Sequence, residues 1–485
     1  MAEPPVVGHD LIMAVHDLRP AWDLPIVSRA DARALGQKQR KAVPRRSLGV
    51  LTDLPRRDAV AHLREQNADR VAELVPLRMQ RMLANPFAFY RGTAALMAAD
   101  LANAPSSNIP VAACGDAHIT NFGFYASPER RLVFDLNDFD EAAIAPWEWD
   151  VKRLVTSVVI GGRHANYDDQ LITVTADAAV RAYVSSLRAS NSMSALERYF
   201  MHLNSEFANQ HMSKQGKRAA KAAIASAERR TGSRALERLT EHAEDGTLRF
   251  RDQPPTMKRI SLDDAQAAGG SAHSDHEVGY LFRQYRDSVP IDIDIVLSQY
   301  LPRDLARRVV GVGSVGTRCY LQLLVGADDD AIVLQIKEAG ESVLSLHGLM
   351  KQPERLTRGV ATHGHGFRVV GLQRILQAVS DPFLGYLGGP NRDYYVRQFH
   401  DMKGSIELEG LSYEAFHDYV LGCAAVLGRS HAQSFTAGRV VGYIGNPESA
   451  SAAIVAWSRA YADLSMRDYE SACEAWNPTT GEDSS

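Results

Sequence analysis

The sequence has few cysteines, and none of them are spaced as pairs. Four cysteines stand far apart among the 485 residues, at positions 114, 319, 423 and 473. A disulfide framework or a structural zinc site requires several cysteines at short, regular spacings. The sequence therefore predicts reduced thiols in a cytoplasmic protein and argues against a cysteine-based zinc site.

Long apolar runs and a dominant charge are also missing. No run of about 18 apolar residues occurs, and the first residues lack the apolar core of a secretion signal. The net charge is −4, with 54 basic and 58 acidic residues. Neither nucleic acid nor a membrane is therefore expected as a partner. The only basic concentration, at residues 38–46, is interpreted as part of a solvated arm.

Helical apolar spacing dominates the chain, with a few strand-like segments. A polar tail is expected after Trp476. The expected elements are helices at 60–103 (interrupted at Asn85), from 149 onwards, at 201–246, 367–379 and 412–434, a strand at 393–399, and a linker or edge strand at 249–259.

Three polar side chains gather in one short loop. Residues 114–121 read CGDAHITN and contain Asp116, His118 and Asn121, and an apolar strand is expected to follow. That strand leads into a second acidic segment at 135–141, DLNDFDE. Such residues also stabilise polar turns. However, several acids beside apolar residues are costly to bury without partners. The pattern therefore favours a metal site over a simple turn.

A glycine-rich segment lies far downstream. Residues 311–317 read GVGSVGT, and strands are expected on the C-terminal side at 318–325 and 332–337, the second ending at Lys337. A dinucleotide fingerprint would lead into a helix, and a Walker loop would carry Lys where Thr317 stands. Glycine loop, hairpin and lysine together match the phosphate-binding arrangement of kinases. The predicted phosphate-binding residues are Gly311, Gly313, Ser314, Gly316, Thr317 and Lys337.

Both segments resemble those of the aminoglycoside and choline phosphotransferases and of the protein kinases. In those families the glycine loop precedes the catalytic loop, whereas here it follows by nearly 200 residues. The resemblance therefore implies a circular permutation. The expected helix at 412–434 contains Leu427 and His431 in the order Leu-x-x-x-His. A similar helix runs directly into the catalytic loop in the small-molecule kinases.

Most of the chain also resembles a bacterial family of domains of unknown function, family 2252, which is distantly similar to kinases. This resemblance implies a fold and a bacterial origin, but it implies no substrate. The matching segments are 86–92, 114–121, 134–141, 146–150, 309–317, 337–339 and 394–397, together with the helix that contains His431.

The fold implied is α+β, a protein-kinase-like two-lobe fold that is circularly permuted. The expected regions are an N-terminal arm (1–60), a helical lobe with the catalytic loop and metal-binding strand (61–290), a nucleotide-binding β lobe (291–405), and C-terminal helices that return to the helical lobe (406–485).

The resulting hypothesis is a phosphotransferase that depends on ATP and Mg²⁺ and acts on a hydroxyl of an unknown small molecule or protein. Asp116 would deprotonate the acceptor, and His118 would steady the loop or serve structure alone. The predicted metal ligands are Asn121 and Asp138, with Asp140 or Asp135 as the next ligand. Two alternatives stay open: an ATP-binding pseudokinase or AMP-transferring enzyme, and a metal-dependent hydrolase built on Asp116, His118 and Asp138.

Three details remain open within this hypothesis. Cys114 stands where kinases carry a histidine, and Asp150 either caps a helix or braces the catalytic loop. The acid that pairs with Lys337 is not evident. Its candidates are Glu341, Glu354 and the amide-bearing Gln373. If the permutation is real, Asp138 and Lys337 must lie together in the folded chain.

Overall fold

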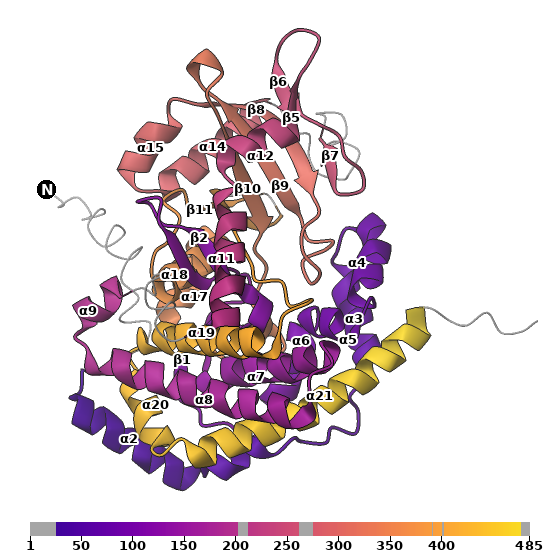
Figure 1. Cartoon of the computed structure of the whole chain (residues 1–485). Helices are drawn as coiled ribbons and strands as arrows, with labels where there is room; N and C mark the ends of the chain where they lie inside the picture. The colour runs from indigo at the N-terminus through magenta and orange to yellow at the C-terminus, as the bar shows by residue number, and fades with distance from the viewer. Residues whose placement is uncertain (1–25, 202–211, 261–274, 390, 400–401, 477–485) are drawn as a thin grey trace, which may run out of the picture.

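A computed structural model describes residues 26–201, 212–260, 275–389, 391–399 and 402–476. The first 25 residues of the predicted arm and the tail after Trp476 lie outside these ranges. Figure 1 shows an antiparallel sheet at one end of the molecule and a layered group of helices at the other. The predicted α+β class is therefore confirmed.

The helical region is built around the buried helix α7 (Trp147–His164). Helix α21 (Glu448–Trp476) packs along α7, and α19 (Tyr413–Ala432) packs along α8 (Asp169–Ser192). The hydroxyl of Ser412 caps α19 by accepting a bond from the backbone N–H of Ala415. This helix lies within the predicted range 412–434.

The chain before α7 forms short helices, and each break has a local cause. Asn85 caps α5 (Pro86–Arg91) and Pro86 occupies its first turn, as the predicted interruption requires. Within the predicted arm, α2 (Arg29–Ala42) packs against α20 (Ala437–Ile444). The remaining early helices are η2 (Arg45–Gly49), α3 (Ala59–Ala68), η3 (Ala72–Leu74), α4 (Val75–Met82) and α6 (Ala94–Ala102).

The six-stranded sheet has the order β11-β12-β10-β9-β8-β7, and all its pairings are antiparallel. The strands predicted at 318–325, 332–337 and 393–399 are all present. The short strand β7 forms one edge, in agreement with the prediction for 249–259. The strands are β7 (Met257–Arg259), β8 (Leu301–Arg308), β9 (Cys319–Val325), β10 (Ala331–Glu338), β11 (Gly385–Gly388) and β12 (Asp393–Gln398).

Two segments of the predicted helical lobe lie with the six-stranded sheet instead. Strand β7 is part of the sheet. Helix α14 (Asp275–Ser288) packs against it, because the Ser288 hydroxyl accepts a bond from the backbone N–H of Tyr386 in β11. The sheet region therefore starts well before residue 291. Residues 240–246, predicted helical, contain a strand that continues into a hairpin. The elements here are α11 (Lys214–Glu228), α12 (Gly232–Leu239), β5 (Thr240–His242), β6 (Leu248–Phe250) and α15 (Ile291–Leu297).

Two further β pairs and three helices lie outside the six-stranded sheet, and Figure 1 shows β2, α17 and α18 between that sheet and helices α7, α8 and α19. The pairs are β1 (Pro110–Ala113) with β4 (Ala143–Pro146), and β2 (Phe122–Ala126) with β3 (Leu132–Leu136). They frame the predicted catalytic loop, which connects β1 to β2. The helices are α16 (Val343–Leu346), α17 (Glu354–His363) and α18 (His365–Leu376), and α9 (Ala195–Phe200) and the short helices η4 (Ile119–Asn121) and η5 (Ala327–Asp329) complete the described elements.

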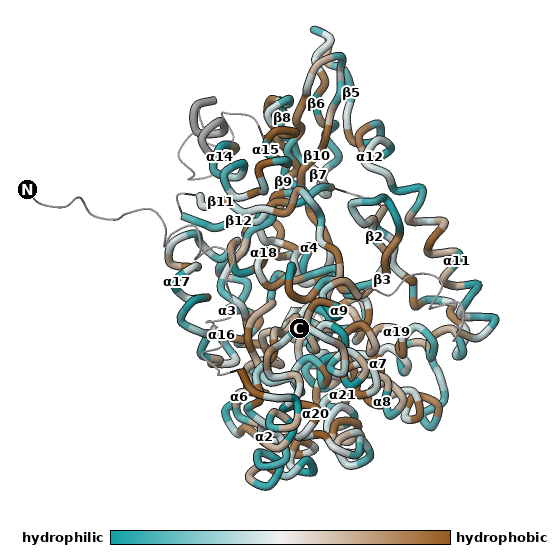
Figure 2. The backbone as a smooth tube through the Cα atoms, turned by 90° about the vertical axis from the view of Figure 1, so that its left-hand side faces the viewer, coloured by the Kyte–Doolittle hydropathy of each residue, from teal (hydrophilic) through white to brown (hydrophobic). Residues whose placement is uncertain are grey.

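The hydropathy of the surface helices is mixed. Figure 2 shows hydrophilic and hydrophobic segments together along α8 and α11. Such helices bury one face and leave the other in water. Among the helices that the structure describes, none has the combination of length and apolar character needed to cross a bilayer.

Candidate functional site

The predicted catalytic loop leaves β1 through a glycine that no other residue can replace without distortion. Gly115 has φ +83°, and a Cβ there would overlap the backbone carbonyl of Glu141. The backbone N–H groups of Cys114 and Gly115 donate to the two carboxylate oxygens of Asp150, at 2.6 and 2.9 Å. Asp150 therefore braces the loop, and α7 has no side-chain cap.

Asp150 is itself held from the far end of the chain. Nε2 of His431 lies 3.1 Å from Asp150 Oδ2, and Nδ1 of the same ring lies 2.9 Å from the hydroxyl of Tyr183. All three side chains are buried. The loop geometry thus depends on α7, α8 and α19 together.

Asp116 lies at the tip of this braced loop, with 21% of its side chain exposed. Nε and Nη2 of Arg153 both lie 2.8 Å from Oδ1, and Oδ2 lies 3.7 Å from Nε2 of His118. Burial raises the pKa of Asp116, and the charge of Arg153 opposes that rise. One carboxylate oxygen is therefore fixed by Arg153, while the other lies beside His118 and has no contact as close.

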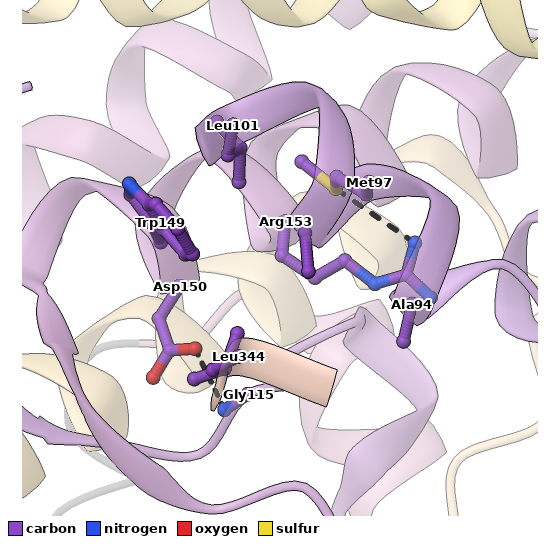
Figure 3. A pocket seen from close by; sticks show the side chains of 9 residues that line it. Ala94, Met97, Leu101, Gly115, Trp149, Asp150, Arg153 and Leu344 are labelled. Atoms are coloured by element: carbon purple, nitrogen blue, oxygen red, sulfur yellow. Dashed lines mark hydrogen bonds between the residues drawn. The ribbon is translucent and has the colours of Figure 1, made fainter. Parts of the chain in front are cut away.

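A small cavity lies directly behind the loop (Figure 3). Its volume is about 10 Å³, room for about one water molecule. Figure 3 shows Asp150 reaching the backbone of Gly115 on one side and Arg153 extending toward Met97 on the other. The cavity is therefore too small to hold a nucleotide or a comparable ligand.

His118 is a buried, uncharged member of the loop. Its Nδ1 lies 3.0 Å from the hydroxyl of Thr120, and only 3% of the residue is exposed. Burial lowers the pKa of His118 well below its usual value, and the charges of Arg91 and Arg153 lower it further. These contacts hold the ring of His118 against Thr120 within the loop.

Asn121 links the loop to the strand that was predicted to bind metal. Its Nδ2 donates to the backbone carbonyl of Asp116 at 2.6 Å, which leaves Oδ1 as its remaining ligand atom. The backbone N–H of Asn137 donates to the carbonyl of Asn121 at 2.9 Å. The thiol of Cys114 adds a bond to the carbonyl of Asp138 at 3.3 Å. Cys114 thus joins the same two segments.

Asp138 and Lys337 lie together, although 199 residues separate them in sequence. Lys337 Nζ lies 3.2 Å from Asp138 Oδ1 and 2.5 Å from Asp140 Oδ2. Asp140 also accepts a bond from the hydroxyl of Tyr395 at 2.6 Å. The lysine thus bridges the two predicted metal-binding carboxylates and connects the sheet to the loop after β3.

Electrostatics separate the pKa values of these groups. Burial opposes the charge of Lys337, but Asp138 and Asp140 outweigh it and raise the lysine pKa well above its usual value. Burial and the charge of Asp138 raise the pKa of Asp140. Burial works against ionised Asp138 as well, but Lys337, Arg397 and Lys403 hold its pKa below the usual range.

The candidate partners of Lys337 need correction. Glu354 pairs with Arg358 on the surface of α17, and Gln373 donates to Gln377 within the core. Neither of these, nor Glu341, is the partner of the lysine, because Asp138 and Asp140 occupy that role. Asp135 is likewise not a metal ligand, because its carboxylate is buried against the guanidinium of Arg429.

The glycine loop connects β8 to β9 and lies next to Lys337. The strand register places Lys337 opposite Cys319, the first residue of β9. Gly311 and Gly316 have φ +70° and +89°, which favours glycine at both positions. The hydroxyl of Ser314 donates to the carbonyl of Val310. That of Thr317 donates to the carbonyl of Ser314.

This loop rests on the early helices. Arg70 donates to the carbonyl of Val315 at 2.6 Å, and Arg81 donates to the carbonyl of Gly311 at 2.9 Å. A Cβ on Gly313 would lie 3.1 Å from the carbonyl oxygen of Arg91. The structure therefore brings the glycine loop, Lys337 and the acidic segment to one place, with α5 beneath the loop.

Three basic residues near this site were not predicted from the sequence to be functional. They are Arg91, Arg397 and Lys403. Arg91 and Arg397 fall in segments that resemble the bacterial family, at 86–92 and 394–397, so a signal existed for both. Lys403 has no comparable signal, since nothing in its surroundings in sequence marks it.

The donor set suits Mg²⁺ better than a metal held by protein alone. Within the described residues, no group of three or more His, Cys, Asp and Glu side chains could hold a metal ion. Mg²⁺ commonly binds through one or two carboxylates together with substrate phosphates. Asp138, Asp140 and the amide oxygen of Asn121 provide such a partial set.

Comparison with protein families assigns most of the chain. A family model described as "uncharacterized protein conserved in bacteria" (DUF2252) matches residues 70–475. The chain belongs to the DUF2252 family. A search of curated proteins and one of solved structures found no match. The DUF2252 region contains the whole candidate site, from Arg91 to Lys403, whereas α2 and α3 precede it.

Proposed function

We propose that this chain is an ATP- and Mg²⁺-dependent phosphotransferase with a circularly permuted, kinase-like two-lobe fold, acting on a hydroxyl group. The observation that carries the proposal is the contact between Lys337 and Asp138 at 3.2 Å. A glycine hairpin ending in lysine and a braced loop bearing Asp116 have no structural need to meet. Their meeting at two further carboxylic acids is what phosphoryl transfer requires.

The position of α19 supports the permutation. Its C-terminal end lies beside β1, because the backbone N–H of Ala112 donates to the hydroxyl of Ser434 at 2.9 Å. His431 near the same end contacts Asp150, the brace of the catalytic loop. The helix thus ends beside the strand into which its counterpart in small-molecule kinases continues. A break in the chain at this point would produce the observed order of motifs.

The proposed roles follow from the contacts. Asp116 would orient the acceptor hydroxyl and take its proton through Oδ2, since Arg153 holds Oδ1. His118, uncharged and bonded to Thr120, would keep the loop in shape. The backbone N–H groups of the glycine loop would cover the phosphates, where glycine permits close approach.

Asp138, Asp140 and Asn121 would hold Mg²⁺, whose charge would stabilise the phosphate oxygens during transfer. In the present structure, the ammonium of Lys337 lies between the two carboxylates. We infer that Lys337 turns toward the phosphates when nucleotide and metal bind, because the carboxylates are needed for the metal. Lys337 would then neutralise the two carboxylates in the free protein and the phosphates in the bound state.

AMP transfer is a second candidate, favoured by one observation. The two ion pairs of Lys337 among the described residues are with the acids of the proposed metal site. If Mg²⁺ takes both of these acids, no other described acid is in position to fix Lys337. The nucleotide can then bind in another orientation. The two reactions are separated by incubating the protein and candidate acceptors with ATP labelled at the α- or γ-phosphate. An acceptor that carries the γ-label indicates phosphoryl transfer, and an acceptor that carries the α-label indicates AMP transfer.

The first test is thermal unfolding in the presence of Mg·ATP. Ligand binding stabilises the folded state by about 2.7 kcal/mol at a hundredfold excess over Kd. We expect the wild type and the control Glu237→Gln, on the exposed surface of α12, to be stabilised equally. Asp138→Asn should lose the magnesium-dependent part of the shift. No shift for the wild type at millimolar Mg·ATP would refute the proposal.

A further inference from the structure

The proposed site holds more positive charge than its ion pairs use. Lys337 pairs with Asp138 and Asp140, and Arg153 pairs with Asp116. Arg91, Arg397 and Lys403 surround the same carboxylates but form no ion pair with any described residue. All three are only partly exposed, and charges that are withdrawn from water are normally paired. Three cations left over at one site indicate a place for an anion that the chain itself does not supply.

Arg91 is the cation nearest to the catalytic loop. Its carbonyl lies under Gly313, and the carbonyl of the preceding residue, Tyr90, accepts a bond from Arg153, which holds Asp116. Nε of Arg91 is buried without a hydrogen-bond partner. Burial lowers the pKa of Arg91, and Asp116 opposes that effect. Its guanidinium therefore lies within electrostatic reach of the proposed base without contacting it.

Arg397 enters the site from the sheet. The register pairs Gln335 with Arg397 and Lys337 with Tyr395, so these four side chains lie on one face of β10 and β12. Arg397 Nε donates to Gln335 Oε1 at 2.9 Å, and Nη1 donates to the carbonyl of Asn137 at 3.4 Å. These two bonds aim the guanidinium at the residue before Asp138.

Lys403 enters from the opposite side, along the β2–β3 hairpin. The next residue, Gly404, forms an antiparallel bridge with Phe124 and exchanges both backbone hydrogen bonds with it. A Cβ on Gly123 would meet the carbonyl of Gly404 and the side chain of Asn137. Lys403 is thus attached beside the acidic segment, where burial and Arg397 lower its pKa to about 7.

We propose that Arg91, Arg397 and Lys403 form a binding site for a chain of phosphate groups, with Arg91 beside Asp116 and the other two beside Asp138. This inference rests on the proposed function and specifies which residues recognise the phosphates. Arg91 then neutralises the phosphoryl group closest to the acceptor, the role that an arginine supplied by the same chain has in some nucleotide hydrolases. The phosphate chain belongs either to the nucleotide or to a phosphorylated acceptor.

The test measures binding of inorganic tripolyphosphate to the full chain by calorimetry, without ATP. We expect Arg91→Gln and Lys403→Gln each to weaken binding about tenfold or more, because each removes a charged hydrogen-bond donor. Arg91→Lys should recover part of the loss. The control, Lys217→Gln on the exposed face of α11, should leave binding unchanged.

Proton uptake gives a second readout that a purely structural lysine would not produce. Lys403 faces Arg397, Lys337, Asp138 and Asp140, and with a pKa of about 7 it is mostly neutral at pH 8. A bound polyanion raises that pKa, so the wild type should take up close to one proton more than Lys403→Gln on binding at pH 8. Calorimetry in two buffers of different ionisation enthalpy measures the proton balance of both proteins, and any proton that tripolyphosphate itself releases cancels in the difference.

The outcomes separate this inference from the proposed function. Tripolyphosphate binding that is equal in all folded variants, with the same proton balance in the wild type and Lys403→Gln, overturns the inference, even if Mg·ATP still stabilises the protein through Asp138. Binding that is weakened in Arg91→Gln and Lys403→Gln, without any transfer from ATP, supports the inference and removes the proposed function. Competition between tripolyphosphate and ATP assigns the site to the nucleotide, and binding of both at once assigns it to the acceptor.

Discussion

Asp116 shows how much a single contact can decide in this site. Its two carboxylate oxygens have different surroundings, because Arg153 binds Oδ1 and leaves Oδ2 beside His118. The order of residues in the loop singled out Asp116 as the candidate acid. The arginine that orients it was not predictable, since Arg153 lies in the following helix and nothing in its spacing relates it to position 116. Long-range pairings of this kind depend on the packing of α7 against the loop.

Replacing Asp116 by Asn should stop catalysis and preserve nucleotide binding. The amide keeps the shape of the side chain and removes the proton acceptor, a change that costs about 10²- to 10⁴-fold in rate. Single-turnover transfer and the Mg·ATP-dependent shift in unfolding temperature measure the two properties separately. Full transfer activity in Asp116→Asn would remove Asp116 as the base.

The pH dependence of transfer should respond to Arg153. Asp116 must be ionised to accept a proton, and burial already raises its pKa while Arg153 opposes the rise. Arg153→Gln should therefore raise that pKa further and move the acid limb of the kcat/KM profile to higher pH. Arg163 lies on the same helix as Arg153 and forms an ion pair near the surface with Asp463 of α21. Arg163→Gln breaks this pair and should leave the acid limb in place. An unchanged limb in Arg153→Gln would contradict this electrostatic coupling.

At the scale of elements, the loop after β1 depends on one backbone position. Gly115 combines a positive φ with a close approach to the carbonyl of Glu141. Most elements around it were predictable, because apolar spacing, Asn85 and Ser412 are local signals. Residues 240–246 were predicted as helix and contain β5 instead. That pairing with β6 is a tertiary choice that local propensity does not record.

Gly115→Ala should destabilise the protein more than Gly246→Ala does. Both glycines have similar φ values, +83° and +80°, so the strain in the backbone is matched. Only Gly115 adds a clash, whereas a Cβ at Gly246 meets nothing within 4 Å. We expect ~1 kcal/mol for Gly246→Ala and ~1–3 kcal/mol beyond that for Gly115→Ala. Urea unfolding of both variants measures the difference, and equal losses would show that the loop relaxes freely.

At the scale of the molecule, Lys337 joins the sheet to the acidic segment and shapes the electrostatics of both. The expectation that Lys337 and Asp138 converge came from reversed motifs, and the contact at 3.2 Å agrees with it. The predicted boundary at residue 291 took no account of β7 and α14 in the sheet region. The sequence of a three-residue edge strand or of an amphipathic helix is similar whichever lobe it packs against. Its packing partner is therefore set by the whole fold.

Lys337→Met should reduce the free energy of unfolding by ~1–3 kcal/mol at pH 8, because two partly exposed carboxylates lose the buried cation that they share. The loss should be smaller at pH 5. Burial and Asp138 raise the pKa of Asp140, and without the lysine that pKa rises further, so acid neutralises the repulsion. Denaturant unfolding at both pH values measures the effect. Lys258→Met, on the exposed face of β7, serves as the control, and an equal loss in the two variants would exclude a role of the carboxylates.

The distance of 199 residues between Lys337 and Asp138 also has a consequence for synthesis. At ~5–20 residues per second, a ribosome extends the chain from one to the other in about 10–40 s. During that interval the nascent chain already carries Asp116, Asp138 and Asp140 but has no lysine between the two acids. His431, which contacts Asp150, is synthesised later still. The order of translation thus delays completion of the site until nearly the whole polypeptide has left the ribosome.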